Sequence, residues 1–105
     1  MLNGIKIKPI RRFQDERGFF ADSMRIDWKD LFGEDTIAQT NFSHTYPNII
    51  LTWHRHIKGQ VNYFLVLRGF AKICIYDDIT AELDEIVSSG FDLKLVRVLG
   101  HYWHV

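Results

Sequence analysis

Four histidines of this chain form two closely spaced pairs. His54 and His56 stand two residues apart, and His101 and His104 form a second pair near the last residue. Residues two apart in an extended strand point to the same face, so the imidazoles of His54 and His56 can reach one point. A neutral imidazole is a suitable base near pH 7. Three imidazoles, from His54, His56 and His104, can instead bind a divalent cation such as Zn²⁺ or Fe²⁺. The two pairs favour a functional site, though not specifically a metal site, and the simpler interpretation is that one pair is merely exposed.

A second candidate is Arg17, which is followed by Gly18 and two phenylalanines. A guanidinium group binds phosphate in a bidentate manner and aromatic rings stack on bases, so this segment is suited to a nucleoside diphosphate. The simpler interpretation is a surface ion pair between Arg17 and Asp15 or Glu16, which contributes little to stability. The sequence contains no phosphate-binding glycine loop, no Gly-x-Ser-x-Gly motif and no context for a nucleophilic cysteine.

Composition places further bounds on function. The chain has 105 residues, of which 47% are hydrophobic and 25% charged, and this is typical of one globular domain. Thirteen basic and thirteen acidic residues cancel, so neither a nucleic-acid partner nor an anionic membrane surface is expected. The single cysteine, Cys74, excludes an intrachain disulfide and a cysteine-based metal site. With no stretch of membrane-spanning length, a cytoplasmic protein is expected.

The elements that must position these residues are short strands. Alternating or apolar runs predict strands at residues 5–8, 36–43, 48–54, 60–67, 70–76, 82–87 and 93–99. The strands at 60–67 and 70–76 are expected to form a hairpin. A helix of about one turn is predicted at residues 27–32, before a glycine. This pattern predicts an all-β, mainly antiparallel jelly roll or barrel with one short helix. Because HYWHV at residues 101–105 reads like the middle of a strand, we expect a single domain at 1–105 that lacks C-terminal strands.

Five segments of the chain match a known family in order. They are FQDERGFFAD (13–22), QTNFS (39–43), WH (53–54), QVNYFLVLRG (60–69) and VLGHYWH (98–104), of which D-x-R-G-F-F is the most specific. Together they resemble the dTDP-4-dehydrorhamnose 3,5-epimerases of the cupin superfamily. The resemblance covers almost the whole chain. It implies a cupin-type double-stranded β-helix, an isomerase without a cofactor that acts on a nucleotide sugar, and a homodimer whose N-terminal residues reach the partner's site.

The resemblance also implies roles for individual residues. His54 matches the family's catalytic base, which removes a proton from the carbon next to the C4 ketone of a dTDP-4-keto-6-deoxyhexose. His104 matches a histidine of a later motif. The residues then expected at the substrate are Arg17, Phe20, Asp22, Gln39, Asn41, His56, Gln60 and Asn62.

Two positions depart from the family pattern. Asn62 stands where the family has a lysine that supports the enolate, and Leu51 stands where it has an arginine. Stabilisation of a developing oxyanion is often a large catalytic contribution, so the loss of this cation bears directly on full 3,5-epimerase activity.

Other functions remain open at this point. His54-x-His56 followed by Gln60 is also similar to the sugar 3,4-ketoisomerases, cupins that act on dTDP-4-keto sugars. A cupin that binds a divalent metal through His54, His56 and His104 is a further alternative. The last is a protein that binds sugar nucleotides without turnover.

Overall fold

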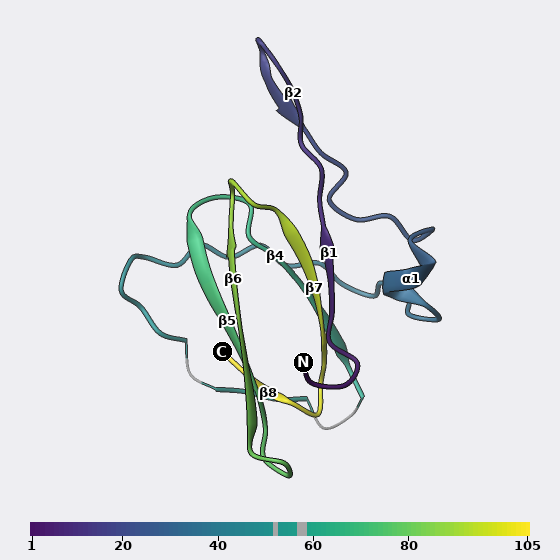
Figure 1. Cartoon of the computed structure of the whole chain (residues 1–105), viewed down its shortest axis with the longest axis vertical. Helices are drawn as coiled ribbons and strands as arrows, with labels where there is room; N and C mark the ends of the chain where they lie inside the picture. The colour runs from purple at the N-terminus through teal and green to yellow at the C-terminus, as the bar shows by residue number, and fades with distance from the viewer. Residues whose placement is uncertain (52, 57–58) are drawn as a thin grey trace.

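The structure is a computed structural model that describes residues 1–51, 53–56 and 59–105 (Figure 1). Its elements are β1 (Lys6–Pro9), β2 (Phe13–Asp15), β3 (Gly18–Phe20), α1 (Lys29–Phe32), β4 (Val61–Leu65), β5 (Phe70–Asp77), β6 (Glu82–Ser89), β7 (Lys94–Leu99) and β8 (Trp103–His104). Every pairing between these strands is antiparallel. The prediction of an all-β, jelly-roll type fold with one short helix is therefore confirmed. Within the described residues, none of the helical structure is long and apolar enough to span a membrane.

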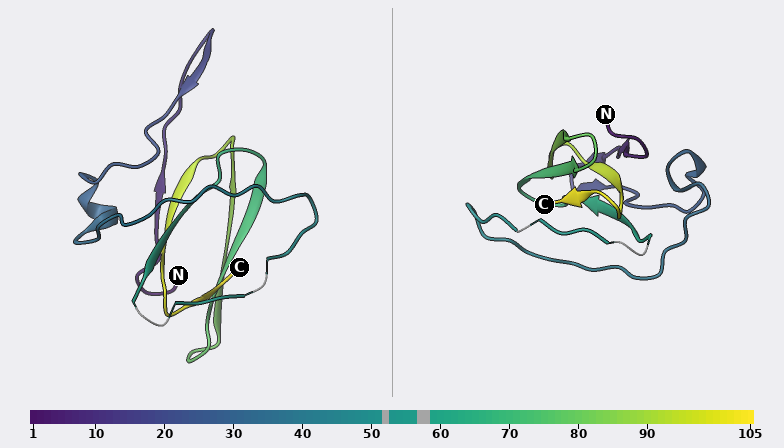
Figure 2. Two further views of the ribbon diagram at one scale, coloured as in Figure 1. Left: turned by 180° about the vertical axis from the view of Figure 1, so that it is seen from behind. Right: turned by 90° about the horizontal axis from the view of Figure 1, so that it is seen from below.

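Two three-stranded sheets enclose the main core, and their strand orders are β1-β7-β4 and β6-β5-β8. Figure 2 shows the two sheets from two further directions. Alternate residues of each sheet point inward, as a half-buried antiparallel sheet requires. The fully buried Ile75 on β5 packs in one cluster with Val96 and Val98 of β7. Burial of such aliphatic side chains stabilises the fold by roughly 1.5–3 kcal/mol each.

The first sheet is also covered on its other face. Leu31 and Phe32 of α1 pack there with Leu95 of β7, in a second buried cluster. Tyr63 of β4 belongs to this cluster, with its ring 4.6 Å from that of Phe32. The side chains of β4 are therefore packed on both faces, which explains why its sequence is almost continuously apolar.

The predicted hairpin between residues 60–67 and 70–76 is wrong. β4 pairs with β7, and β5 pairs with β6 in the other sheet, so the chain crosses between the sheets at residues 66–69. Gly69 adopts a φ of 79°, which is unfavourable for other residues, and its carbonyl accepts a hydrogen bond from the Gly90 amide at 3.0 Å. A Cβ on Gly90 would lie 2.7 Å from the Leu67 carbonyl oxygen. The crossover therefore depends on two glycines that a strand pattern does not reveal.

The strands predicted at 36–43 and 48–54 are also wrong. Residues 36–51 are exposed throughout and contain no strand, and in the second range His54 alone forms an isolated bridge, with residue 52 outside the described residues. This segment crosses one side of the two sheets (Figure 2). A strand forms only where a neighbouring backbone supplies hydrogen bonds. An alternating sequence alone did not identify such a neighbour.

Candidate functional site

The structure brings together one histidine from each sequence pair. The amide of His54 donates to the carbonyl of His104 at 3.0 Å, and the amide of His104 donates back to the carbonyl of His54 at 2.9 Å. The centroids of the two imidazole rings lie 5.0 Å apart. On its other side His104 pairs with Ile75 of β5. His104 is thus held between two backbone segments, with its ring next to that of His54.

Two more rings surround His104. The ring of His56 lies 5.6 Å from that of His104, and the ring of Phe64 lies 5.4 Å from it. The amide of His56 donates to the carbonyl of Gly100 at 2.7 Å. A Cβ on Gly100 would lie 2.1 Å from the Gln60 carbonyl oxygen, so only glycine fits where these segments meet. The imidazoles of His54, His56 and His104 therefore form one group, called the histidine cluster below.

The environment of His104 differs from that of its neighbours. His104 is 5% exposed, whereas His54 is open to solvent. Burial, with a smaller contribution from His54 and His56, lowers the pKa of His104 below its ordinary value. Its Nδ1 is buried and has no hydrogen-bond partner among the described residues. A buried imidazole with a lowered pKa is neutral near pH 7, and an exposed imidazole beside it is accessible to a substrate.

Asn62 lies on β4 two residues before Phe64, and so on the same face of the strand. That is the face that contacts His104 through the Phe64 ring. The Nε2 of Gln60 donates to the Oδ1 of Asn62 at 2.8 Å. Gln60 and Asn62 therefore form a polar pair on the histidine side of the sheet.

Arg17 and Phe20 are not brought to the histidine cluster within one chain. They lie on the β2–β3 hairpin, which projects away from the two sheets (Figure 1). The guanidinium of Arg17 donates to Asp15 Oδ2 at 2.6 Å, and this interaction lowers the pKa of Asp15. The surface ion pair considered from the sequence is thus present. A hollow of about 310 Å³ adjoins the hairpin, and Phe20 and Arg17 both line it.

The other sequence candidates are dispersed. Asp22 is exposed just after β3. Gln39 and Asn41 lie on the exposed segment 36–51, where Gln39 Nε2 donates to Asn41 Oδ1 at 3.0 Å. His101 is exposed and stacks against Tyr102, with 4.1 Å between ring centroids. Within the described residues, the side-chain contacts of Gln39, Asn41 and His101 lie outside the histidine cluster.

The metal alternative finds no support in this geometry. Across residues 1–51, 53–56 and 59–105, no group of three His, Cys, Asp or Glu side chains is arranged to hold a metal ion. His54, His56 and His104 all belong to these described residues.

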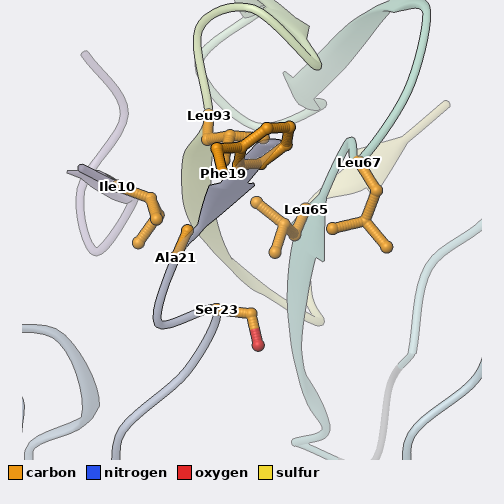
Figure 3. Close-up of a pocket in the computed structure, with 7 residues that line it drawn as sticks. All are labelled: Ile10, Phe19, Ala21, Ser23, Leu65, Leu67 and Leu93. Carbon is orange, nitrogen blue, oxygen red and sulfur yellow. The ribbon is translucent and has the colours of Figure 1, made fainter. Parts of the chain in front are cut away.

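An apolar pocket that sequence reasoning missed lies on the opposite face of the first sheet. Its volume is about 180 Å³, and Figure 3 shows Leu65 and Leu67 facing Phe19 and Ala21 across it. Leu65 and Phe64 are adjacent on β4 and point to opposite faces, so the sheet separates this pocket from the histidine cluster. The pocket joins residues from three distant segments, which no local pattern could indicate.

A polar network on the same outer face also escaped prediction. The Nε of Arg97 donates to Asp35 Oδ2 at 2.8 Å, and Tyr63 donates its hydroxyl hydrogen to the same carboxylate. Burial and the bond to Asp35 raise the pKa of Tyr63 to about 12, while Arg97 lowers the pKa of Asp35. The network fixes Asp35 to β4 and β7, immediately before the exposed segment 36–51. It positions the chain rather than forming part of the histidine cluster.

Two curated proteins are similar to this chain. The probable low-salt glycan biosynthesis epimerase Agl13 of Haloferax volcanii is 29% identical over 98% of this chain and 68% of its own length. The spore coat polysaccharide biosynthesis protein SpsL of Bacillus subtilis is 34% identical over 73% of this chain and 48% of its own length. No family model matches the chain, and no solved structure matches it. The relatives are thus proteins of glycan and polysaccharide biosynthesis, and at this modest identity they support a sugar-epimerase-like family for the chain.

Proposed function

We propose that this chain acts as a nucleotide-sugar epimerase on a dTDP-4-keto-6-deoxyhexose, in the manner of the 3,5-epimerases. The observation that carries the proposal is the pairing of His54 with His104, whose rings lie 5.0 Å apart although they come from distant segments. Similarity to a protein named as a glycan biosynthesis epimerase supports the reaction class. We also propose that residues 1–105 form one domain of the cupin type.

His54 is the proposed base. Its exposure makes the imidazole accessible to a bound sugar, where it would remove the proton from the carbon next to the C4 ketone. His104 would assist as a neutral imidazole next to His54, because the lowered pKa of His104 disfavours its charged form. A second positive charge beside His54 would make it harder for His54 to accept a proton.

Asn62 is the proposed donor to the enolate that proton removal creates. Its Oδ1 accepts a hydrogen bond from Gln60, so its amide NH₂ is the group left to donate. A neutral donor stabilises an oxyanion less than a cation does, and turnover slower than that of an enzyme with a lysine at this position is expected. Replacing a lysine by an amide keeps the hydrogen bond and removes the charge.

The binding residues of the N-terminal part are proposed to serve a partner's site in a homodimer. Arg17 and Phe20 lie on the projecting hairpin, and Asp22 follows it, while Gln39 and Asn41 lie on an exposed segment. A hairpin directed away from its own sheets is well suited to reach a second subunit. Arg17 would bind the diphosphate and Phe20 would stack on the base.

A 3,4-ketoisomerase reaction is the second candidate, and the position of His56 favours it. The His56 ring lies 5.6 Å from that of His104. His54 and His56, which belong to one segment, therefore both lie beside the His104 ring. Such a reaction moves the ketone from C4 to C3, whereas epimerisation leaves the ketone in place. Chromatography of the products therefore separates the two reactions.

The direct test is incubation with dTDP-4-keto-6-deoxyglucose in D₂O, followed by mass spectrometry of the recovered nucleotide sugar. We expect the wild-type chain to raise the mass of the sugar and His54→Asn to abolish the increase. His101→Asn is the matched control, because it removes an exposed imidazole outside the histidine cluster. Equal exchange by His54→Asn and wild type would refute the assigned base.

A further inference from the structure

Alternate residues around the histidine cluster point to the opposite face and form a group of their own. In β8 and β5, His104 faces Ile75 while Trp103 faces Tyr76. Along residues 53–56, Trp53 and Arg55 alternate with the two histidines. The ring of Trp53 meets that of Tyr76 edge-on, with 6.3 Å between centroids. The face behind the histidine cluster is therefore lined by aromatic rings and one arginine.

Asp78 joins the segments of this rear face. Its Oδ2 accepts a hydrogen bond from Arg55 at 3.2 Å and another from the Trp103 indole N–H at 3.4 Å. The Arg55 guanidinium also lies over the Trp103 ring, 4.6 Å from its centroid. One carboxylate, one guanidinium and one indole thus contact one another in a closed triangle.

The turn that carries Asp78 is itself fixed. Asp78 directly follows the last residue of β5, and the carboxylate of that residue, Asp77, accepts a hydrogen bond from the Ile79 amide at 3.0 Å. The turn that presents the Asp78 carboxylate is therefore stabilised by a hydrogen bond that does not involve residues 53–56.

Residues 53–56 have little backbone support of their own. Their described main-chain bonds are the two with His104 and the one from His56 to Gly100. An isolated bridge of this kind opens more readily than a continuous ladder, because few bonds must break together. Side-chain contacts on the rear face can therefore decide how firmly His54 is held.

We propose that Arg55, Asp78 and Trp103 form a latch that holds residues 53–56 on β8 and so positions His54 against His104. The latch residues are positioning residues, since none of them belongs to the histidine cluster. That the latch serves catalysis rests on the proposed function, whereas its effect on the His54 segment does not. Asp78→Ala removes the ion pair and the Trp103 hydrogen bond, whereas Arg55→Gln removes the ion pair and the cation–π contact. Either loss corresponds to about a tenfold change in an opening equilibrium.

The test is hydrogen exchange of the His54 and His104 amides, measured by NMR without substrate. In Asp78→Ala we expect both amides to exchange about tenfold faster than in wild type, with the amides of β7 unchanged as an internal reference. Glu85→Ala is the control, because Glu85 forms a similar exposed ion pair with Lys72 away from this segment, at 3.6 Å. Exchange within twofold of wild type in Asp78→Ala, or equal acceleration in Glu85→Ala, would overturn the latch.

A second variant keeps the test decisive if Asp78→Ala loses protection throughout β7. Arg55→Gln then replaces it, because this variant removes the charge from the other side of the ion pair. The His54 and His104 amides should again exchange about tenfold faster than in wild type, and exchange within twofold of wild type would overturn the latch. If the proposed epimerase activity is found, both variants should lower kcat for deuterium incorporation and leave KM within about twofold, since the latch touches no substrate. A rise in KM with unchanged kcat would contradict the positioning role, and absence of activity in the wild type would refute the function but not the latch.

Discussion

His54 and His104 exchange both backbone hydrogen bonds across a single bridge, and their imidazole rings lie 5.0 Å apart. The backbone bridge sets the distance between the rings. The core beneath His104 sets its protonation state, because the ring is buried and Ile75 on the neighbouring strand is fully buried. One imidazole is thus kept neutral and the other accessible by the same local structure.

The first prediction concerns the pH dependence of stability through His104. The folded-state pKa of His104 lies below its ordinary value of 6.5. The His104 imidazole therefore takes up a proton more readily in the unfolded chain than in the folded chain. The free energy of unfolding should therefore fall as pH decreases from about 7.5 through 6.5. Urea denaturation of wild type and His104→Gln at several pH values checks this. The variant should lose less stability over that range, and equal losses would contradict the assignment.

The second prediction concerns the network around Asp35. The side chains of Asp35 and Arg97 are 21% and 14% exposed, so their removal from water is substantial. Asp35→Ala should lower the free energy of unfolding by about 1–3 kcal/mol, because it leaves Arg97 and Tyr63 without their partner. Asp30→Ala is the control, since Asp30 is exposed and pairs with Lys8 at 3.8 Å. Its cost should stay within about 0.5 kcal/mol. Similar costs for both variants in urea denaturation would contradict this account.

The sequence predicted the strand-rich fold and the histidine cluster to different extents. The parity of His54 and His56 indicated that both rings would face one group, and the structure places both beside His104. The crossover at Gly69 was not predictable, because β4 is apolar on both faces and its partner is chosen by tertiary packing. Asp35 and Arg97 meet across distant segments, so their pairing left no local signal.

The third prediction concerns nucleotide binding by Arg17. Arg17→Ala should weaken binding of a thymidine diphosphate sugar roughly tenfold or more, because a charge-assisted contact to phosphate is lost. Isothermal titration calorimetry measures this. The matched control is Arg25→Ala, since Arg25 forms a comparable exposed pair with Asp27 at 2.7 Å. Unchanged binding in Arg17→Ala would remove this residue from the proposed site.

The fourth prediction is a homodimer in solution. Large apolar side chains are exposed on segment 36–51 and the hairpin, including Phe42 at 83%, Ile50 at 85% and Phe20 at 65% exposure. Contiguous exposed apolar surface commonly marks an interface. Light scattering should return twice the chain mass. Phe42→Asp should shift the protein to the monomer, and a wild-type monomer at working concentration would contradict the prediction.

The most direct measurement is the position of deuterium in dTDP-4-keto-6-deoxyglucose after incubation with the wild-type chain in D₂O. Proton removal next to the ketone predicts label at C3 and C5, read by NMR of the recovered sugar. Loss of that label in His54→Asn would tie the exchange to the paired histidines. A chain that binds the nucleotide sugar but leaves C3 and C5 unlabelled would contradict the proposed epimerase.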